Sequence, residues 1–469
     1  MGVLYLFFMP GTSLFNITYI NYNIKKETSK YSASHVSAIE LNSRSYEIEI
    51  IESETEQIYL KAHSNSFGFV NSSHKNFNVQ SKLDNEVLSI SITEPYGFAT
   101  TNLSSIELYL PASKAFDLTI SNIKAKTTIN SENIQINNFK YTTQKGSLTF
   151  KSGALNGNLE LNLGSGDFTV SKDVATNTND ISLKMTTGSF KAPNSVFGDL
   201  TITENKRGVI SIGACANLRE SQKSAGGQIT INLVTHANIT AGDTIIKINE
   251  ITNSAIIDLT KSGKVKIDKL TGISSISTNT GSINLDETLS PITLYSESGD
   301  INVSRAFYKV SVKANNSSVR INFAYTAESY LSNNDARVLY ASIKNGSLTA
   351  TGVEHVGVAS SDTQAILDGG IKITGNGRAH ITMQNIYETN SIEGNNGTIN
   401  IVVNKDSQYV LKTSSAGGSV RVNLTQTSEF GGYRNQELIT TYVNCSSSTN
   451  SLDVTTNNGS LTILDTNFA

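Results

Sequence analysis

The chain has no tryptophan, 5 prolines and 2 cysteines among 469 residues, and only 16% of its residues are charged. So few cysteines exclude a dense disulfide scaffold, and the pair Cys215 and Cys445 cannot form a zinc site alone. The scarcity of charged residues excludes a coiled coil. The net charge is −3 and no basic stripe occurs, so we expect no nucleic-acid partner. No apolar run reaches the ~20 residues of a membrane-spanning helix, so a complete transmembrane segment is not expected.

What is abundant is asparagine, serine, threonine and glycine, with 34 glycines in the chain. A short pattern recurs in which glycine and a small or polar residue precede an aliphatic–polar–aliphatic triplet. It begins at Gly146, Gly166, Gly188, Gly208, Gly227, Gly263, Gly281 and Gly299, and again at Gly346, Gly397, Gly418 and Gly459. Gly263, Gly281 and Gly299 follow one another at intervals of 18 residues. A near-constant interval of this length indicates a stacked repeat architecture.

The triplets alternate as β-strands do. In the copy Gly281–Leu285, Ile283 and Leu285 share one face of a strand and Asn284 points the other way. A strand this short buries too little to be stable alone, whereas stacked coils bury their aliphatic residues in one continuous column. The sequence therefore predicts an all-β fold, a parallel β-solenoid or β-helix with coils of about 18–22 residues.

The corners of these coils carry two further expectations. The repeated glycine permits a positive φ at a tight turn. The residue after it is often serine or aspartate, as at Ser147, Asp167, Ser189, Ser282, Asp300 and Ser347. We expect these side chains to line up at one corner and to bind backbone groups of the turn.

The repeat also suggests a division of the chain. Residues 1–13 contain the apolar run Val3–Met9 and are expected to be a leader remnant or a leading strand, with a signal or anchor possible upstream. Residues 14–120 hold longer strands and few glycines, as expected of an N-terminal β-sheet cap. Residues 121–330 are expected to form the solenoid, and residues 331–469 its continuation or a second repeat unit. A helical turn is conceivable within residues 332–342.

Three segments carry a family resemblance: LGSGDFTV (163–170), TNTGSINL (278–285) and SESGDINV (296–303). They resemble the Gly-Ser/Asp-Ile repeats of the bacterial putative-adhesin domain family, and the preceding segment 106–121 is similar to that family's strand–proline–strand step. The resemblance covers roughly residues 36–330. It implies a β-solenoid with a surface or adhesive role and supplies no catalytic residues.

No group of residues predicts chemistry. The six histidines, His35, His63, His74, His236, His355 and His380, form no metal-binding spacing, and no nucleophile elbow or phosphate loop occurs. Asp167, Asp199 and Asp300 follow glycines, where aspartate is common for turn reasons. We therefore expect no catalytic residue, no cofactor and no metal, and two free thiols, although one long-range disulfide stays possible.

Three functions remain. The first is a non-enzymatic, adhesin-like repeat protein at the cell surface or outside the cell, whose polar flank binds a protein, glycan or matrix surface. The second is a carbohydrate-active β-helix enzyme, which needs two carboxylates facing one sugar linkage. The third is a structural element in which solenoid ends stack.

Overall fold

The computed structural model describes residues 19–28, 30–69, 78–93, 100–171, 175–176, 180–222, 226–325, 337–358, 369–425, 430–433 and 436–468. The apolar run at residues 3–9 lies outside this part of the chain. The described residues fall into two compact units, Met1–Asn177 (unit 1) and Thr178–Ala469 (unit 2). The boundary expected near residue 330 stays a prediction.

Unit 1 is built from fourteen strands and one short 3-10 turn, η1 (Ala33–His35), among its described residues. The strands are β1 (Tyr19–Glu27), β2 (Tyr31–Ser32), β3 (Ala38–Ser43), β4 (Glu47–Ser53), β5 (Gln57–Phe69), β6 (Asn78–Asp84), β7 (Val87–Thr93), β8 (Thr100–Pro111), β9 (Phe116–Asn122), β10 (Lys126–Thr143), β11 (Ser147–Leu155), β12 (Leu159–Leu163), β13 (Asp167–Val170) and β14 (Ala175–Thr176).

Unit 2 contains the other twenty-four described strands, and no helix occurs in its described ranges. They are β15 (Asp180–Met185), β16 (Ser189–Asn205), β17 (Val209–Gln222), β18 (Gln228–Ala241), β19 (Ile245–Leu259), β20 (Lys264–Leu270), β21 (Ser274–Thr278), β22 (Ser282–Thr288), β23 (Ile292–Ser296), β24 (Ile301–Ala306), β25 (Val310–Ala314), β26 (Ser318–Phe323), β27 (Leu339–Lys344), β28 (Ser347–Val353), β29 (Ile371–Thr374), β30 (Arg378–Met383), β31 (Thr389–Gly394), β32 (Thr398–Asn404), β33 (Tyr409–Ser415), β34 (Ser419–Asn423), β35 (Phe430–Tyr433), β36 (Gln436–Val443), β37 (Ser451–Thr456) and β38 (Ser460–Thr466).

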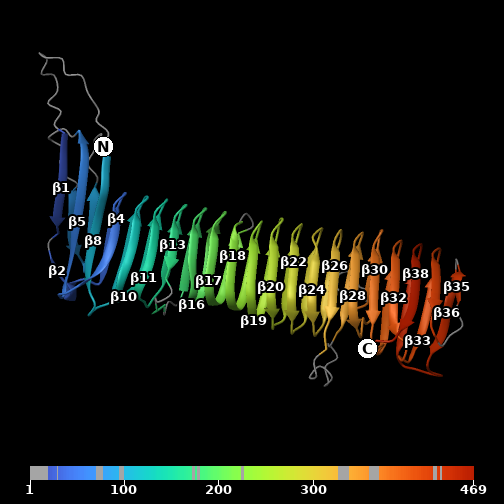
Figure 1. Ribbon diagram of the computed structural model, residues 1–469. Helices are drawn as coiled ribbons and strands as arrows, with labels where there is room; N and C mark the ends of the chain where they lie inside the picture. The colour runs from blue at the N-terminus through green and yellow to red at the C-terminus, as the bar shows by residue number, and fades with distance from the viewer. Residues whose placement is uncertain are drawn as a thin grey trace, which may run out of the picture. The chain divides into compact units, whose positions relative to one another are not determined.

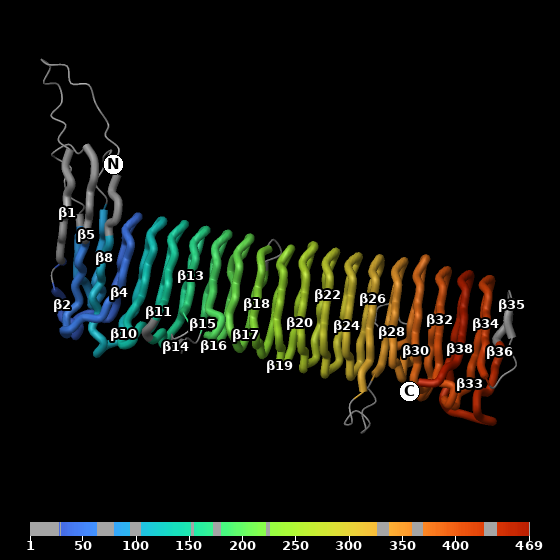
Figure 2. The backbone as a smooth tube through the Cα atoms, viewed as in Figure 1, coloured from blue at the N-terminus to red at the C-terminus, as the bar shows by residue number. Residues whose placement is uncertain are grey.

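Both units are parallel stacks of coils, and each regular coil of unit 2 supplies one strand to each of two parallel ladders (Figures 1 and 2). In one ladder Val265 pairs with Ile283 and Ile283 with Ile301, which keeps the 18-residue interval of the sequence. Ile283 and Leu285 are 0% exposed, and Asn284 lies on the outer side. The predicted all-β parallel solenoid is therefore confirmed.

Antiparallel strands close the N-terminal end of unit 1. Strand β5 runs antiparallel to β1 and β8, and β6 runs antiparallel to β7. The parallel ladder begins beside them, because β3 pairs in parallel with β7 and β9. The expected N-terminal β-sheet cap is thus present, and it covers the backbone groups that a solenoid would otherwise leave open to other chains.

The last coil of the chain does not come last in the stack of unit 2. Strand β37 pairs in parallel with both β31 and β33, and β38 pairs with both β32 and β34. The coil formed by residues 451–466 is thus held between two coils that precede it in the sequence. The antiparallel strands β35 and β36 border the coil of β33 and β34.

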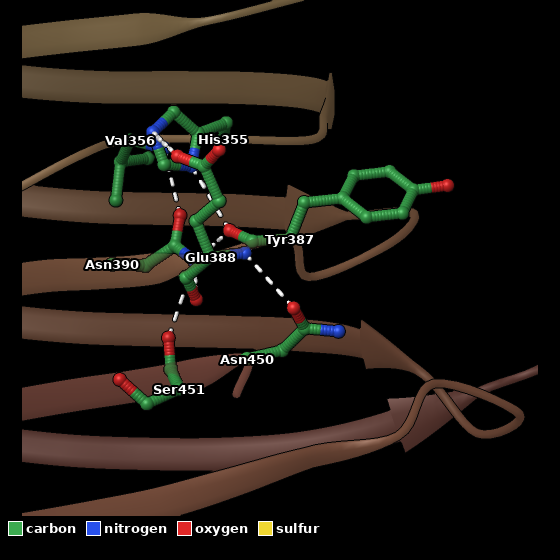
Figure 3. A network of polar contacts seen from close by, with 7 residues as sticks. All are labelled: His355, Val356, Tyr387, Glu388, Asn390, Asn450 and Ser451. Carbon is green, nitrogen blue, oxygen red and sulfur yellow. Dashed lines mark hydrogen bonds and ion pairs between the residues drawn. The ribbon is translucent and has the colours of Figure 1, made fainter. Parts of the chain in front are cut away.

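A buried amide fixes this inserted coil at one corner (Figure 3). Asn390 is 0% exposed, and its Nδ2 donates to the carbonyl oxygens of Tyr387 at 2.8 Å and Ser451 at 3.2 Å. Its Oδ1 accepts from the backbone N–H of Val356 at 2.8 Å. The N–H of Glu388 donates to Asn450 Oδ1 at 3.0 Å, so side chains as well as ladders join the coils.

The corner glycines are required for a reason other than the expected one. Gly281 and Gly299 do not have a positive φ, although Gly227 does, at 92°. A Cβ at Gly281 would overlap the carbonyl oxygen of Gly263, and a Cβ at Gly299 would overlap that of Gly281. The expectation of left-handed turns is wrong for these two corners, because stacked backbones leave no room for a side chain.

The hydrogen bonds of the turn also come from an unexpected position, three residues before the glycine. The N–H of Gly146 donates to Thr143 Oγ1 at 2.7 Å, and the N–H of Gly299 donates to Ser296 Oγ at 2.8 Å. The side chain at this position points inward and bonds the turn from within the coil. The residues after the glycines do align, since Ser147 pairs with Asp167, but they lie at the start of the next strand.

Two smaller expectations are settled as well. Residues 339–342 belong to strand β27, so the conceivable helix is wrong there, while residues 332–336 lie outside the described ranges. The strand forms because Leu339, Ala341 and Ile343 fill the inner column. Cys215 is buried, Cys445 is half-buried, and both thiols are free.

We expect Gly281→Ala to destabilise unit 2 by about 2 kcal/mol or more, because the new methyl group displaces the backbone of the preceding coil. Denaturant unfolding followed by circular dichroism measures this loss. Ser282→Ala, one residue further on at a half-exposed site, is the control and should cost less than about 0.5 kcal/mol. Equal stability of the two variants would contradict backbone stacking at the corner.

We expect Asn390→Ala to loosen the inserted C-terminal coil, because it leaves the N–H of Val356 and two carbonyl groups without their buried partner. The expected cost is about 2–4 kcal/mol. Hydrogen exchange of residues 451–466 should become faster, while exchange in β20 and β22 stays unchanged. The control is Asn400→Ala, on the outer side of β32.

Candidate binding face

The outer side of one ladder in unit 2 is a face of polar side chains, held by strands β16, β17, β18 and β19. Each strand places alternate residues outward, and the parallel register puts equivalent residues on consecutive coils side by side. We define the polar face as these outward residues: Asp199, Thr201, Asn217, Arg219, Ser221, His236, Asn238, Thr240, Ser254 and Asp258. Neutral amides and hydroxyls predominate over charges in this set.

Equivalent residues on consecutive coils form rows across this face. Hydrogen bonds between coils orient the row made of Asp199, Asn217, His236 and Ser254. Asn217 Nδ2 donates to Asp199 Oδ1 at 2.5 Å, and Arg219 lies 3.4 Å from the other oxygen of that carboxylate. On the next coils His236 Nδ1 and Ser254 Oγ are 2.9 Å apart. The charges of Asp199 and Arg219 are therefore matched to each other, and the row presents ordered polar groups with little net charge.

A hollow of about 390 Å³ opens beside the two neighbouring rows. One of these rows begins with Thr201 and Arg219, and the other with Ser221 and Thr240. Its outward lining residues are Thr201, Thr203, Arg219, Ser221, Asn238 and Thr240. Together they offer hydroxyl groups that donate and accept, an amide that does both, and one guanidinium that donates. This set matches a ligand with many hydroxyl groups, such as a sugar, or an exposed peptide backbone.

Apolar side chains border the polar face. Ile256 follows Arg219 and Asn238 in register on the next coil and is 59% exposed. Ile273 precedes β21 and is 73% exposed. A ligand that contacts this face could therefore bury apolar area on Ile256 while it bonds the polar groups beside it.

Beneath the hollow, Glu220 occupies a position where the solenoid otherwise places isoleucine. It pairs in register with Ile202 on one side and Ile239 on the other, and its side chain points into the core. Glu220 is 2% exposed, and neither carboxylate oxygen has a hydrogen-bond partner within the protein. Desolvation by burial raises the pKa of Glu220 from its ordinary value of 4.5 to about 8, so the group is mostly neutral at pH 7.

Asp199 and Glu220, the two carboxylates beside the hollow, do not face one another. Asp199 lies on the outer side of the ladder and Glu220 on the inner side, so one sugar linkage could not lie between them. Another buried carboxylate of unit 2, Glu354, is paired with the guanidinium of Arg337. Among the described residues no group of three histidine, cysteine, aspartate or glutamate side chains could hold a metal ion.

The sequence predicted no site residue. The histidines considered as candidates lie in different surroundings in the structure. His236 lies on the polar face, His355 contacts the carbonyl of Tyr387 at a corner, and His380 lies on the outer side of β30. His74 and the side chain of His63 lie outside the described residues. Glu220 was missed, although the segment Leu218-Arg-Glu220 breaks the aliphatic–polar–aliphatic pattern at an inner position.

Comparison with known proteins places the chain among β-rich relatives. The family model described as Toastrack DUF4097 matches residues 36–351. No curated protein matches the chain. No described helix is long and apolar enough to cross a membrane.

Solved structures of low sequence identity are also similar. A protein from Parabacteroides merdae, described as a putative adhesin, is 13% identical, with 62% of this chain and 95% of that chain covered and a TM-score of 0.27. A cell adhesion protein from Clostridium sporogenes, likewise described as putative, is 9% identical, with 95% and 100% covered and a TM-score of 0.16. A Parabacteroides distasonis protein described as a putative lipid binding protein is 11% identical, with 70% and 96% covered and a TM-score of 0.19.

The buried carboxyl group predicts a pH-dependent stability with a defined sign. Because the pKa of Glu220 is higher in the folded chain than in the unfolded one, its contribution is most favourable below pH 4.5 and is lost as the pH rises toward 8. We expect Glu220→Gln to be more stable than the native chain by up to about 3 kcal/mol at pH 7, and to match it at pH 4.

Denaturant unfolding between pH 4 and pH 8 measures the difference between the two chains. Glu393→Gln, an outward carboxylate of β31, is the matched control and should keep the native slope. A Glu220→Gln difference that stays constant over this range would show that the carboxyl group does not titrate as described.

Proposed function

The chain belongs to the Toastrack DUF4097 family, and we propose that it is a non-enzymatic, adhesin-like protein that binds a surface glycan outside the cell through its polar face. The observation that carries this proposal is the array of hydroxyl, amide and guanidinium groups around the hollow of unit 2, in which Arg219 is held by Asp199 and Thr203 by the carbonyl of Leu183. Sugar hydroxyls are recognised by such donors and acceptors when the protein groups are already oriented. Protein and matrix surfaces are the other partners this face fits.

The arrangement of the carboxylates supports a role without catalysis. Glycoside hydrolysis requires an acid and a second carboxylate on the two sides of one linkage. Beside the hollow, Asp199 is paired with Arg219 and accepts a hydrogen bond from Asn217, and Glu220 lies inside the core. A hollow with this lining can hold a sugar by hydrogen bonds, and it does not provide the pair of groups that would cleave it.

The binding role is tested with the recombinant chain on immobilised polysaccharides and extracellular-matrix glycoproteins. The variant Thr201→Val combined with Thr240→Val removes two hydroxyl groups from the hollow while keeping the shape of both side chains. We expect binding to weaken about tenfold, since two hydrogen bonds of ordinary strength are lost. The control is Thr349→Val combined with Thr462→Val, which makes the same change on the outer side of the other ladder.

Three results would refute this function. The first is the absence of binding to every surface by the native chain, and the second is an equal loss in the hollow and control variants. The third is the release of reducing ends from a bound polysaccharide, abolished by Asp199→Asn, which would establish the carbohydrate-active enzyme instead. Localisation is tested separately, by labelling intact cells with an antibody against unit 2.

A further inference from the structure

A second hollow lies in unit 1, at the carboxyl ends of three neighbouring parallel strands, β3, β7 and β9. Its volume is about 360 Å³, and its polar lining includes Asn42, Ser43, Arg44, Ser91, Thr93 and Ser121. In register, Asn42 of the central strand β3 lies between Ser91 and Ser121. The hollow therefore combines small polar side chains from three strands with a single guanidinium.

Ser43 lies at the edge of this hollow, but its side chain points into the core. Its side chain is 6% exposed, and its Oγ has no hydrogen-bond partner within the protein. The neighbouring inward residue Asn122 is fully engaged, since it bonds Thr127, Thr143 and Tyr141. The side chains open to a ligand are therefore the outward ones of Asn42, Ser91, Thr93 and Ser121 together with Arg44, and the buried hydroxyl of Ser43 is not among them.

Three cations line up along the corners beside the hollow. We define the basic corner as Arg44, Lys124 and Lys145, which stand at consecutive turns of unit 1. The backbone connects these turns, because Lys124 N–H donates to the Arg44 carbonyl at 3.3 Å and Lys145 N–H to the Ile123 carbonyl at 2.7 Å. Adjacent coils are about 4.8 Å apart, so the three side chains can contact neighbouring groups of one extended ligand.

These three cations are exposed, and none forms an ion pair within the described part of the chain. The carboxylate that follows the first turn, Glu47, is already engaged by Lys126 at 3.5 Å. A local excess of positive charge on a chain with net charge −3 is a favourable place for an anion. It is most favourable for one that also carries hydroxyl groups.

We propose that the hollow and the basic corner together bind an acidic glycan, with a carboxylated or sulfated sugar at Arg44. The acid group accepts from the Arg44 guanidinium, which can donate two parallel hydrogen bonds to it. Sugar hydroxyls bond Asn42, Ser91 and Ser121, and the following acidic groups lie along Lys124 and Lys145. Among the lining residues that the structure describes none is aromatic, so they offer no platform on which a nucleic-acid base would stack.

This site is in a different unit from the polar face and goes beyond the function proposed for it. Its test uses three acidic probes, trigalacturonate, sialyllactose and a heparin tetrasaccharide, each beside an uncharged counterpart: the methyl ester, lactose and the desulfated, carboxyl-reduced tetrasaccharide. Titration calorimetry of the full chain should show binding of at least one acidic probe. It should show binding weaker by about tenfold or more for the uncharged counterpart.

The combined variant Arg44→Gln, Lys124→Gln and Lys145→Gln should weaken binding of that probe by about tenfold or more. Ser121→Ala should weaken it without altering its salt dependence, since it removes an outward hydroxyl and no charge. Lys151→Gln, an exposed lysine of β11 outside the basic corner, is the matched control and should bind as the native chain does. Circular dichroism and thermal unfolding check that every variant is folded.

Several results would overturn the proposal. These are no binding of any acidic probe, equal binding of the uncharged counterpart, and the same loss in Lys151→Gln. Binding to phosphatidylserine vesicles that the triple variant abolishes, without binding of an acidic sugar, would assign the basic corner to a membrane surface instead. The hollow variants of unit 2 should leave binding of the acidic probe intact, so failure here and failure of the function proposed above are distinguishable.

Discussion

The contact on which the rest of this protein depends is the close approach of one backbone turn to the next at the corners of the solenoid. Gly263, Gly281 and Gly299 lie over one another so closely that a single Cβ would overlap a carbonyl oxygen. This spacing holds consecutive strands at hydrogen-bonding distance, and it thereby keeps inner residues in one aliphatic column and outer residues in rows. Both candidate binding sites are consequences of those rows.

Much of this arrangement could be predicted because it depends on short sequence patterns. The alternation in Gly281–Leu285 and the 18-residue interval are enough to predict the inner column, which contains Ile283 and Leu285 as expected. A β-sheet cap at the N-terminus was also predicted, since longer strands with few glycines differ visibly from the repeat, whereas its antiparallel pairing was not. These features follow from short-range pattern, which is the part of a fold that one sequence states most directly.

Other features could not be predicted because they depend on residues brought together from far apart. In the stack, the coil of residues 451–466 lies between β31 and β33, although both strands precede it in the sequence. No local pattern specifies that order. The reason for the corner glycines was misjudged, since a turn considered alone suggests backbone freedom and only the stack shows that space is the constraint. The inward Thr143 and Ser296 were missed for the same reason, as their bonds lie inside the coil.

The candidate sites show the same division between local and distant information. Glu220 could have been noticed, because a carboxylate stands where the repeat requires an aliphatic residue. Its consequence, a raised pKa of about 8, needs the burial that the stack supplies.

Charged residues are also rearranged by the stack. In the sequence they are interspersed, which argues against any charged surface. Stacking places the charged residues at equivalent positions of adjacent coils side by side. Glu250 and Lys269 become neighbours on adjacent coils at 2.9 Å, as do Glu287 and Arg305 at 2.5 Å. The same sorting leaves Arg44, Lys124 and Lys145 beside one another without a matching acid within the described residues. In a solenoid, therefore, the meaningful measure of charge is the composition of a register row, and a chain with a small net charge can still present a site for an anion.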